Sequence, residues 1–328
     1  MNSSTYRNDW TREEVQGIFE KPLLELVYEA ATVHRQTNTA DTVQVCTLLS
    51  VKTGGCPEDC SYCPQAARFH TDVEAQKLMD VNEVLGSAKD AKESGSTRFC
   101  MGAAWREVRD NRDFDKVLQM ISGVNAMGLE VCCTMGMLTE EQAVKMKAAG
   151  LHAYNHNLDT SEEFYGEVIS TRNYDDRLET LANVRNAGVN VCSGGIIGMG
   201  ESREDRIGML HTLSTLPAHP ESVPVNALVP VEGTPLEEQP LVEIWEMVRM
   251  VATARILMPA TKVRLSAGRI RMSVVEQAFL FMAGANSIFA GDKLLTTPNN
   301  GVNQDQAMFD LLGLSPEKSK KLSEMQPA

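Results

Sequence analysis

Three cysteines lie close together in one short segment of the chain, at the spacing C-x3-C-x2-C. They are Cys56, Cys60 and Cys63, and glycine and proline flank them. Three thiolates in one loop can hold three irons of a 4Fe–4S cluster. An open fourth position is typical of a catalytic metal centre, whereas a structural zinc site closes with four protein ligands. We therefore predict an iron–sulfur cluster with one open iron. The alternative is a structural zinc site with His70 as its fourth ligand.

Three further cysteines and one arginine fall within four different predicted strands. These residues are Cys100, Cys132, Cys192 and Arg264. Because side chains alternate along a strand, all four can point into the interior of a barrel and form a second metal site. Taken singly, a cysteine is more often a small buried apolar residue. An arginine in a barrel interior needs an anionic partner, and thiolates that hold a cluster would supply one.

The adjacent cysteines Cys132 and Cys133 must point to opposite faces of their strand. The spacing leaves open which of the two faces the interior. Cys46 lies in the middle of the first predicted strand, and we interpret it as a core residue.

Polar residues alternate along the fourth predicted strand. Asn155, Asn157 and Asp159 share one face, which we expect to point inward, and inward polar groups need partners. The carboxylate of Asp159 accepts two hydrogen bonds, which suits the hydroxyls of a ribose. His156 falls on the opposite face, and we interpret it as a core histidine with its hydrogen bonds satisfied.

Short apolar segments alternate with amphipathic helical patterns over most of the chain. We predict eight strands, at 43–49, 97–101, 130–135, 153–158, 190–197, 223–229, 262–266 and 287–290. Helical patterns lie at 81–93, 114–127, 140–149, 177–187, 202–216, 241–257 and 274–283. This alternation predicts an α/β fold, a (β/α)8 TIM-type barrel with its active site at the carboxyl ends of the strands. An open doubly wound sheet is the alternative.

The first forty residues predict a helical extension ahead of the barrel. Thr11 and Glu14 have the spacing of a capping box, and Pro22 stands near the start of a second helical pattern. We predict three regions: a helical extension at 1–40, a barrel at 41–315 and a C-terminal tail at 316–328.

Composition narrows the class of protein. The chain has 328 residues and a formal net charge of −13, which argues against sequence-independent binding to nucleic acid or to an anionic membrane. No secretory signal or membrane-spanning stretch is visible, so we expect a cytoplasmic enzyme. A disulfide framework is a poor interpretation of eight cysteines in such a chain, and metal binding or catalysis is the better one.

The cysteine segment, with Tyr62 directly before Cys63, resembles the signature of the radical S-adenosylmethionine superfamily. The resemblance implies that the open iron binds the amino and carboxylate groups of the cofactor's methionine. It also implies that an electron from the cluster cleaves the S–C5′ bond and leaves a 5′-deoxyadenosyl radical. Tyr62 occupies the position that lies against the adenine in that superfamily.

A finer resemblance rests on further segments. The sequences around Cys100, Asn157, Cys192 and Arg264, and those at 284–289 and 294–299, are similar to the biotin synthase family. The resemblance implies that a 2Fe–2S cluster is held by Cys100, Cys132, Cys192 and Arg264. It places the ligand of the adjacent pair at Cys132.

The same resemblance implies which residues contact small molecules. Those implied for the cofactor are Tyr62, Asn157, Asp159, Arg177 and Ile196. Those implied for the substrate are Asn155, Asn157, Asn226, Thr296 and Thr297, with Asn226 on the ureido ring and the threonines near the carboxylate. The amide of Asn226 offers both a donor and an acceptor, which suits a cyclic urea.

The reaction implied is the insertion of sulfur into dethiobiotin to form biotin, with sulfur taken from the 2Fe–2S cluster. Neither carbon that receives sulfur is acidic, so we predict no acid–base pair; the cofactor carries the chemistry while protein groups position the reactants. The resemblance also implies a flavodoxin or ferredoxin type electron donor and a homodimer. The alternatives are another radical enzyme of the same subfamily, of maturase or mutase type, and a non-catalytic metal-binding protein.

Overall fold

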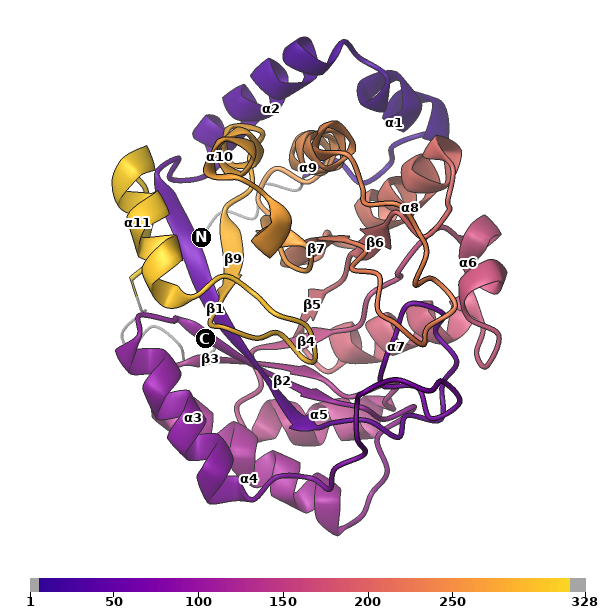
Figure 1. Ribbon diagram of the computed structural model, residues 1–328, viewed down its shortest axis with the longest axis vertical. Coiled ribbons are helices and arrows are strands. Elements are labelled where there is room, and N and C mark those ends of the chain that lie inside the picture. Colours follow the sequence, from indigo (N-terminus) through magenta and orange to yellow (C-terminus); the bar gives the residue numbers. More distant parts are fainter. Residues whose placement is uncertain (1–5, 319–328) are drawn as a thin grey trace.

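Eight parallel β-strands close into a barrel in the computed structural model, which describes residues 6–318 (Figure 1). The strands run in the order β1 (Thr42–Lys52), β2 (Arg98–Ala103), β3 (Glu130–Thr134), β4 (Ala153–Asn155), β5 (Asn190–Cys192), β7 (Ser222–Ala227), β8 (Lys262–Leu265) and β9 (Ser287–Ala290). Pairing of β1 with β9 closes the ring. The predicted (β/α)8 fold is therefore confirmed, and the open-sheet alternative is excluded.

Helices surround this ring on the outside (Figure 1). They are α1 (Arg12–Phe19), α2 (Leu23–Thr37), α3 (Val81–Glu93), α4 (Arg112–Ala126), α5 (Glu140–Ala148), α6 (Glu162–Val168), α7 (Tyr174–Asn186), α8 (Arg203–Thr215), α9 (Ile244–Leu257), α10 (Val274–Met282) and α11 (Val302–Leu312), with a short 3-10 helix η1 (Arg269–Arg271). The predicted capping box of Thr11 and Glu14 starts α1, and Pro22 precedes α2.

Strand alternation divides the buried side chains into two sets. Residues such as Val45 and Val131 face the helices and join the main apolar core. Residues of opposite parity, such as Cys100 and Cys132, face the lumen. Each large aliphatic side chain buried in the outer core contributes roughly 1.5–3 kcal/mol. Because the outer core supplies this apolar burial, the lumen can contain thiols and polar groups.

The predicted strand at 190–197 is broken in the structure. After Cys192 the ladder stops, and a separate strand β6 (Gly195–Ile197) pairs with β7. Pro224 of β7 has no N–H to donate to the ladder. Its carbonyl oxygen would lie 2.0 Å from a Cβ built on Gly194, so only glycine fits where the two backbones approach. Gly194 therefore allows the backbone after β5 to approach the backbone of β7 closely.

The fourth strand is shorter than the predicted 153–158, because β4 ends at Asn155. Asn157 and Asp159 follow it in a loop, and Asp159 has a left-handed φ of 69°. The expectation that all three share one strand face is therefore wrong. Their side chains nevertheless meet at the same cavity.

The N-terminal helices pack against the outside of the barrel, α1 on α8 and α2 on α9. At the other end, a short strand β10 (Ser315–Pro316) pairs with β1. Of the predicted tail, residues 319–328 lie outside the described residues. Among the helices within residues 6–318, none combines the length and the apolar character needed to cross a membrane.

Candidate active site

A cavity of about 320 Å³ opens at the carboxyl ends of the barrel strands. Both predicted cysteine groups reach it, the loop cysteines from above and Cys100 and Cys132 from within the lumen. Nearly all the other predicted site residues line it as well: Tyr62, Asn155, Asn157, Asp159, Arg177, Ile196, Asn226, Arg264, Thr296 and Thr297. The topology thus brings together residues that are up to 241 positions apart.

The cysteine loop is held by its own backbone and by one buried carboxylate. The N–H of Cys56 donates to the carbonyl of Gln65 at 2.9 Å. Asp59 accepts the backbone N–H groups of Ser170 and Thr171 at 3.0 and 3.1 Å. Although burial acts to raise it, these hydrogen bonds and those from the hydroxyls of Ser170 and Thr171 hold the pKa of Asp59 at about 2. The loop is therefore fixed to the segment that follows α6.

All eight cysteines are free, and those of the loop are largely shielded from water. Burial raises the pKa of the Cys60 thiol to about 11 and that of Cys63 to about 12. Without metal these groups retain their protons, and metal binding must displace them.

The described side chains do not form a site for a single metal ion. Within residues 6–318, no three His, Cys, Asp or Glu side chains converge closely enough to hold one ion. His70, the fourth ligand of the zinc alternative, is exposed and does not line the cavity. A 4Fe–4S cluster binds each thiolate to a different iron, so its ligands need not converge on one point.

Strand register decides which of the adjacent cysteines faces the lumen. Cys132 packs in an inner cluster with Cys100 and Phe289, whereas Cys133 joins the outer core. The predicted inward direction of Cys132 is confirmed. Cys46 is buried, as expected, but it belongs to the same inner cluster and is therefore a fourth thiol in the lumen.

The guanidinium of Arg264 faces sulfur. Arg264 is 1% exposed, and its Nη1 donates to the Sγ of Cys192 at 3.7 Å. Its Nε donates to the hydroxyl of Ser287 at 2.9 Å, and its Nη2 to the Oε1 of Gln44 at 3.2 Å. The ring of Phe289 lies below it at 5.0 Å. The four residues predicted to hold the second cluster thus share one lumen.

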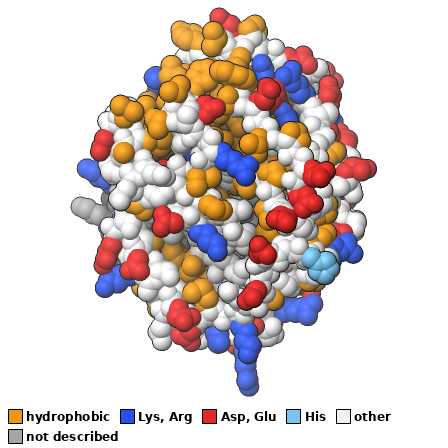
Figure 2. Space-filling model, viewed as in Figure 1, with side chains coloured by type: hydrophobic (Ala, Val, Ile, Leu, Met, Phe, Trp, Pro, Cys, Tyr) orange, Lys and Arg blue, Asp and Glu red, His pale blue; other side chains and the backbone are white. Residues whose placement is uncertain are grey.

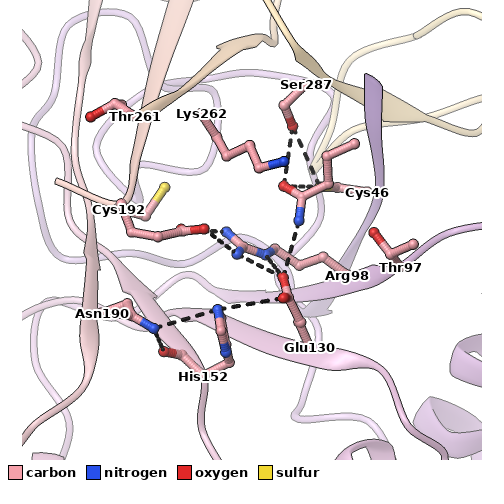
Figure 3. Close-up of polar contacts among 12 residues, drawn as sticks. Cys46, Thr97, Arg98, Glu130, His152, Asn190, Cys192, Thr261, Lys262 and Ser287 are labelled. Atoms are coloured by element: carbon pink, nitrogen blue, oxygen red, sulfur yellow. Dashed lines mark hydrogen bonds and ion pairs between the residues drawn. The ribbon is translucent and has the colours of Figure 1, made fainter. Parts of the chain in front are cut away.

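Ion pairs close the amino end of the lumen, and we call this layer the barrel floor (Figure 3). Arg98, which is fully buried, donates to Glu130 at 2.8 Å and to Glu221 at 2.8 and 2.9 Å. Although burial opposes it, Arg98 keeps the pKa of Glu221 below its usual value. Gln44 connects this floor to Arg264, because its Nε2 donates to Glu130 at 3.0 Å.

The residues of the barrel floor are not among those predicted from the sequence. A signal was present, since Arg98 and Glu130 have the same strand parity as Cys100 and Cys132 and must point into the lumen with them.

Asp159 and Arg177, both implied for the cofactor, form an ion pair with each other. Asp159 also accepts the hydroxyl of Tyr62 at 2.8 Å, and Arg177 donates to the hydroxyl of Tyr165 at 2.9 Å. Because both charges are buried, this pair fixes the two side chains in position at the cavity wall.

The asparagines are oriented by their neighbours. Asn155 donates to Asn157 at 3.0 Å and to the Sγ of Cys192 at 3.3 Å. Asn226 donates to the carbonyl of Gly195 at 2.9 Å and accepts the N–H of Ala267 at 3.1 Å. Each amide has two donors and two lone pairs. Beyond these two hydrogen bonds the amide has one further donor and one further lone pair, and Asn226 lines the cavity.

His156 departs from its predicted role. It is 3% exposed and lines the cavity, and its Nε2 has no hydrogen-bond partner among the residues that the structure describes. Burial, together with Arg177 and Arg172, lowers the pKa of His156 well below its usual value. The prediction of a satisfied histidine on the outer face is wrong, because β4 ends before it and strand alternation no longer applies.

Comparison with known proteins identifies the class to which this fold and site belong. A model of the radical SAM superfamily matches residues 50–213, and a model of the biotin and thiamin synthesis associated domain matches residues 224–315. Among solved structures, methylornithine synthase covers 98% of the chain at 18% identity with a TM-score of 0.80, and is itself covered to 98%. HydG, a maturase of the [FeFe]-hydrogenase, is matched over 96% of this chain and 74% of its own at 18% identity, with a TM-score of 0.81. These structures share the fold.

Closer relatives identify the family. Biotin synthase of Cytophaga hutchinsonii is 71% identical over 96% of this chain and 94% of its own length. The mitochondrial biotin synthase of Arabidopsis thaliana is 62% identical over 95% of this chain and 82% of its own. The chain belongs to the biotin synthase family. Membership implies S-adenosylmethionine, a 4Fe–4S cluster and a 2Fe–2S cluster as cofactors, and the two thiol groups on one cavity fit that donor set.

Proposed function

We propose that this chain converts dethiobiotin to biotin in the cavity at the carboxyl end of its barrel. The observation that carries the proposal is the meeting of two separate thiol groups at one cavity, with a buried arginine beside the deeper group. A radical enzyme with a single 4Fe–4S cluster needs only Cys56, Cys60 and Cys63 as ligands. Cys100, Cys132, Cys192 and Arg264 have no role in it.

In this proposal Cys56, Cys60 and Cys63 hold the 4Fe–4S cluster. Cys100, Cys132, Cys192 and Arg264 hold the 2Fe–2S cluster. When bound, these clusters and S-adenosylmethionine supply a carbon radical and the sulfur for carbons that no side chain could deprotonate.

The chain's own side chains position the reactants between the two clusters. Asp159, fixed by Arg177 and Tyr62, presents a carboxylate to the cofactor's ribose. Asn226, fixed by Gly195 and Ala267, turns its remaining donor and lone pair to the ureido ring. The further proposed contacts are Ile196, Asn157 and Arg177 for the cofactor and Asn155, Asn157, Thr296 and Thr297 for the substrate. Barrel walls that exclude water protect a radical from side reactions.

A homodimer is part of the proposal, and the surface offers one face for it. Exposed apolar side chains gather over α2, α9 and α10 (Figure 2): Leu24, Tyr28, Trp245, Val275 and Met282, which we call the α2–α9–α10 face. The rings of Trp245 and Phe279 lie 6.0 Å apart and join α9 to α10. Contiguous apolar patches of this kind are typical of interfaces. The same family resemblance supports a flavodoxin or ferredoxin type donor.

The test is product formation by protein reconstituted with iron and sulfide without oxygen. We expect two cluster types by absorption and iron count, and both 5′-deoxyadenosine and biotin under single-turnover conditions. Cys60→Ala should abolish 5′-deoxyadenosine, while Cys133→Ala, a buried thiol of the outer core, should retain it. A wild-type protein that loads both clusters but forms no biotin would overturn the proposal, as would wild-type cleavage by Cys60→Ala.

A further inference from the structure

Arg172 is a buried cation that the functional assignments above leave without a role. It stands in the segment between α6 and α7, its side chain is 7% exposed, and it lines the cavity. Its Nη2 donates to the Sγ of Cys60 at 3.8 Å. Its Nε is buried and has no hydrogen-bond partner within residues 6–318.

The nearby carboxylates are engaged by other groups. Glu58 lies 3.7 Å from the Nε of Arg172, beyond hydrogen-bond distance, and is paired with Arg106 at 3.1 Å and with the hydroxyl of Thr171. Asp159 is paired with Arg177. Arg172 therefore has an ion pair with Glu58 but no hydrogen bond to it. A buried guanidinium is unfavourable unless its other donors also face an anion or an acceptor. The group that Arg172 does face is the sulfur of Cys60.

The position of Arg172 is set by the same contacts that hold the cysteine loop. Asp59 fixes Ser170 and Thr171, the two residues directly before it. The loop that carries Cys60 and the segment that carries Arg172 are therefore one rigid unit. An arginine held in this way can act on the sulfur without a change of conformation.

We propose that Arg172 raises the reduction potential of the 4Fe–4S cluster by acting through the Cys60 sulfur. The inference rests on the proposed cluster at Cys56, Cys60 and Cys63. Reduction adds negative charge to a cluster, and hydrogen bonds to its sulfurs together with nearby positive charge stabilise that form. Arg172 is thus a positioning residue that makes the electron easier to deliver.

The test measures the potential of the reconstituted cluster, without S-adenosylmethionine, by the electron paramagnetic resonance signal of the reduced form. Loss of a charge-assisted hydrogen bond in Arg172→Gln should lower the reduced-to-oxidised ratio about tenfold at a fixed potential, which corresponds to about 59 mV for one electron. Arg172→Lys keeps the charge but loses the planar fork, so we expect a smaller shift. Arg106→Gln is the matched control, because Arg106 binds the same Glu58 and the carbonyl of Thr171 but donates to no cysteine within residues 6–318.

The outcomes separate this inference from the proposed function. If Arg172→Gln loads its cluster with an unchanged potential but binds S-adenosylmethionine more weakly, Arg172 is a cofactor-carboxylate ligand and the inference is wrong. An equal shift in Arg106→Gln would also overturn it, since the effect would then be general charge. If Arg172→Gln does not load iron, the potential of Arg172→Lys is measured instead. An unchanged potential in Arg172→Lys would then contradict the inference. Failure of the wild-type protein to form a 4Fe–4S cluster would instead reject the proposed function.

Discussion

Gln44 connects the proposed cluster ligand Arg264 to the ion pairs of the barrel floor. Its amide cannot turn around freely, because Glu130 requires a donor and Arg264 requires an acceptor. Glu130 is in turn fixed by Arg98. The direction in which the Arg264 guanidinium points is therefore set in part by residues that are not themselves proposed ligands of the cluster.

We expect Gln44→Met to disturb the second cluster while sparing the first. The substitution preserves length but removes both hydrogen bonds. The Nη2 of Arg264 loses this acceptor, whereas Glu130 still accepts from Arg98, and we expect the protein to be destabilised by about 1–3 kcal/mol. The measurement is the 2Fe–2S absorption and circular dichroism spectrum, with 5′-deoxyadenosine formation measured in parallel. Gln277→Met is the control, because Gln277 is also buried and accepts from an arginine, Arg269, at 3.0 Å. If the 2Fe–2S spectrum of Gln44→Met were the same as that of Gln277→Met, Gln44 would not act on the cluster through Arg264.

The adjacent cysteines provide a second test at this scale. We expect Cys132→Ala to remove the 2Fe–2S spectrum and Cys133→Ala to retain it, since Cys132 lies in the lumen and Cys133 in the outer core. Cys133→Ala should only lose packing, at a cost of about 1 kcal/mol. Iron and sulfide content of both variants, measured after reconstitution, checks this. If the spectrum changed in Cys133→Ala and not in Cys132→Ala, the ligand would be Cys133 and the proposed assignment of Cys132 would be wrong.

The inward residues could be predicted where a regular strand persists and not elsewhere. Alternation, together with the family motif, predicted Cys132 correctly because β3 runs without a break from Glu130 to Thr134. The same rule failed at His156, where the strand had already ended. Arg172 lies between helices, and no periodic pattern indicates where a loop side chain points.

At the scale of elements, the N-terminal extension depends on a neutral histidine. His34 of α2 is 3% exposed, and its Nδ1 has no hydrogen-bond partner among the described residues. Burial, with help from Arg255 and Arg35, lowers the pKa of His34 to about 4 from the usual 6.5. Protonation therefore opposes the packing of α2 on the barrel.

Stability should accordingly fall as the pH falls from 6.5 towards 4. Since the folded state binds this proton less well than the unfolded state, the contribution is complete above pH 6.5 and amounts to up to about 3 kcal/mol. We expect His34→Gln to flatten this part of the pH profile. Urea unfolding at pH 7.5 and pH 5 measures it, with the exposed His70→Gln as control. A wild-type slope retained in His34→Gln would exclude His34 as the cause.

The order of elements could be predicted well, but their ends could not. Each predicted strand corresponds to at least one observed strand, because apolar segments flanked by glycine mark them clearly. The break between β5 and β6 comes from Pro224 of a neighbouring strand, a tertiary contact that local pattern does not contain. The helix α6 has seven residues, too few to show a clear 3.6-residue period.

At the scale of the whole molecule, the α2–α9–α10 face and the active site lie on different parts of the barrel. Leu24, Tyr28, Trp245, Val275 and Met282 lie on the outer helices α2, α9 and α10 (Figure 1). The cavity is lined instead by residues of the barrel strands and of the loops that follow them. Assembly through this face therefore leaves the cavity mouth open to substrate. It also means that the dimer can be tested without disturbing the clusters.

If the parent chain forms the proposed dimer, we expect the double variant Tyr28→Asp, Val275→Asp to be monomeric at the same concentrations. The two side chains are 72% and 79% exposed in the single chain, so replacing them leaves the core intact. Burying a large apolar side chain contributes roughly 1.5–3 kcal/mol. A C2 interface uses each residue twice, so the dissociation constant should rise at least about a hundredfold. Sedimentation velocity over a concentration series measures the dissociation constant.

Val144→Asp is the control, because Val144 is 51% exposed on α5, across the barrel from α10 (Figure 1). A dimer of unchanged affinity in the double variant would show that another surface mediates assembly, and a fall in single-turnover 5′-deoxyadenosine would show that this face and the cavity are coupled.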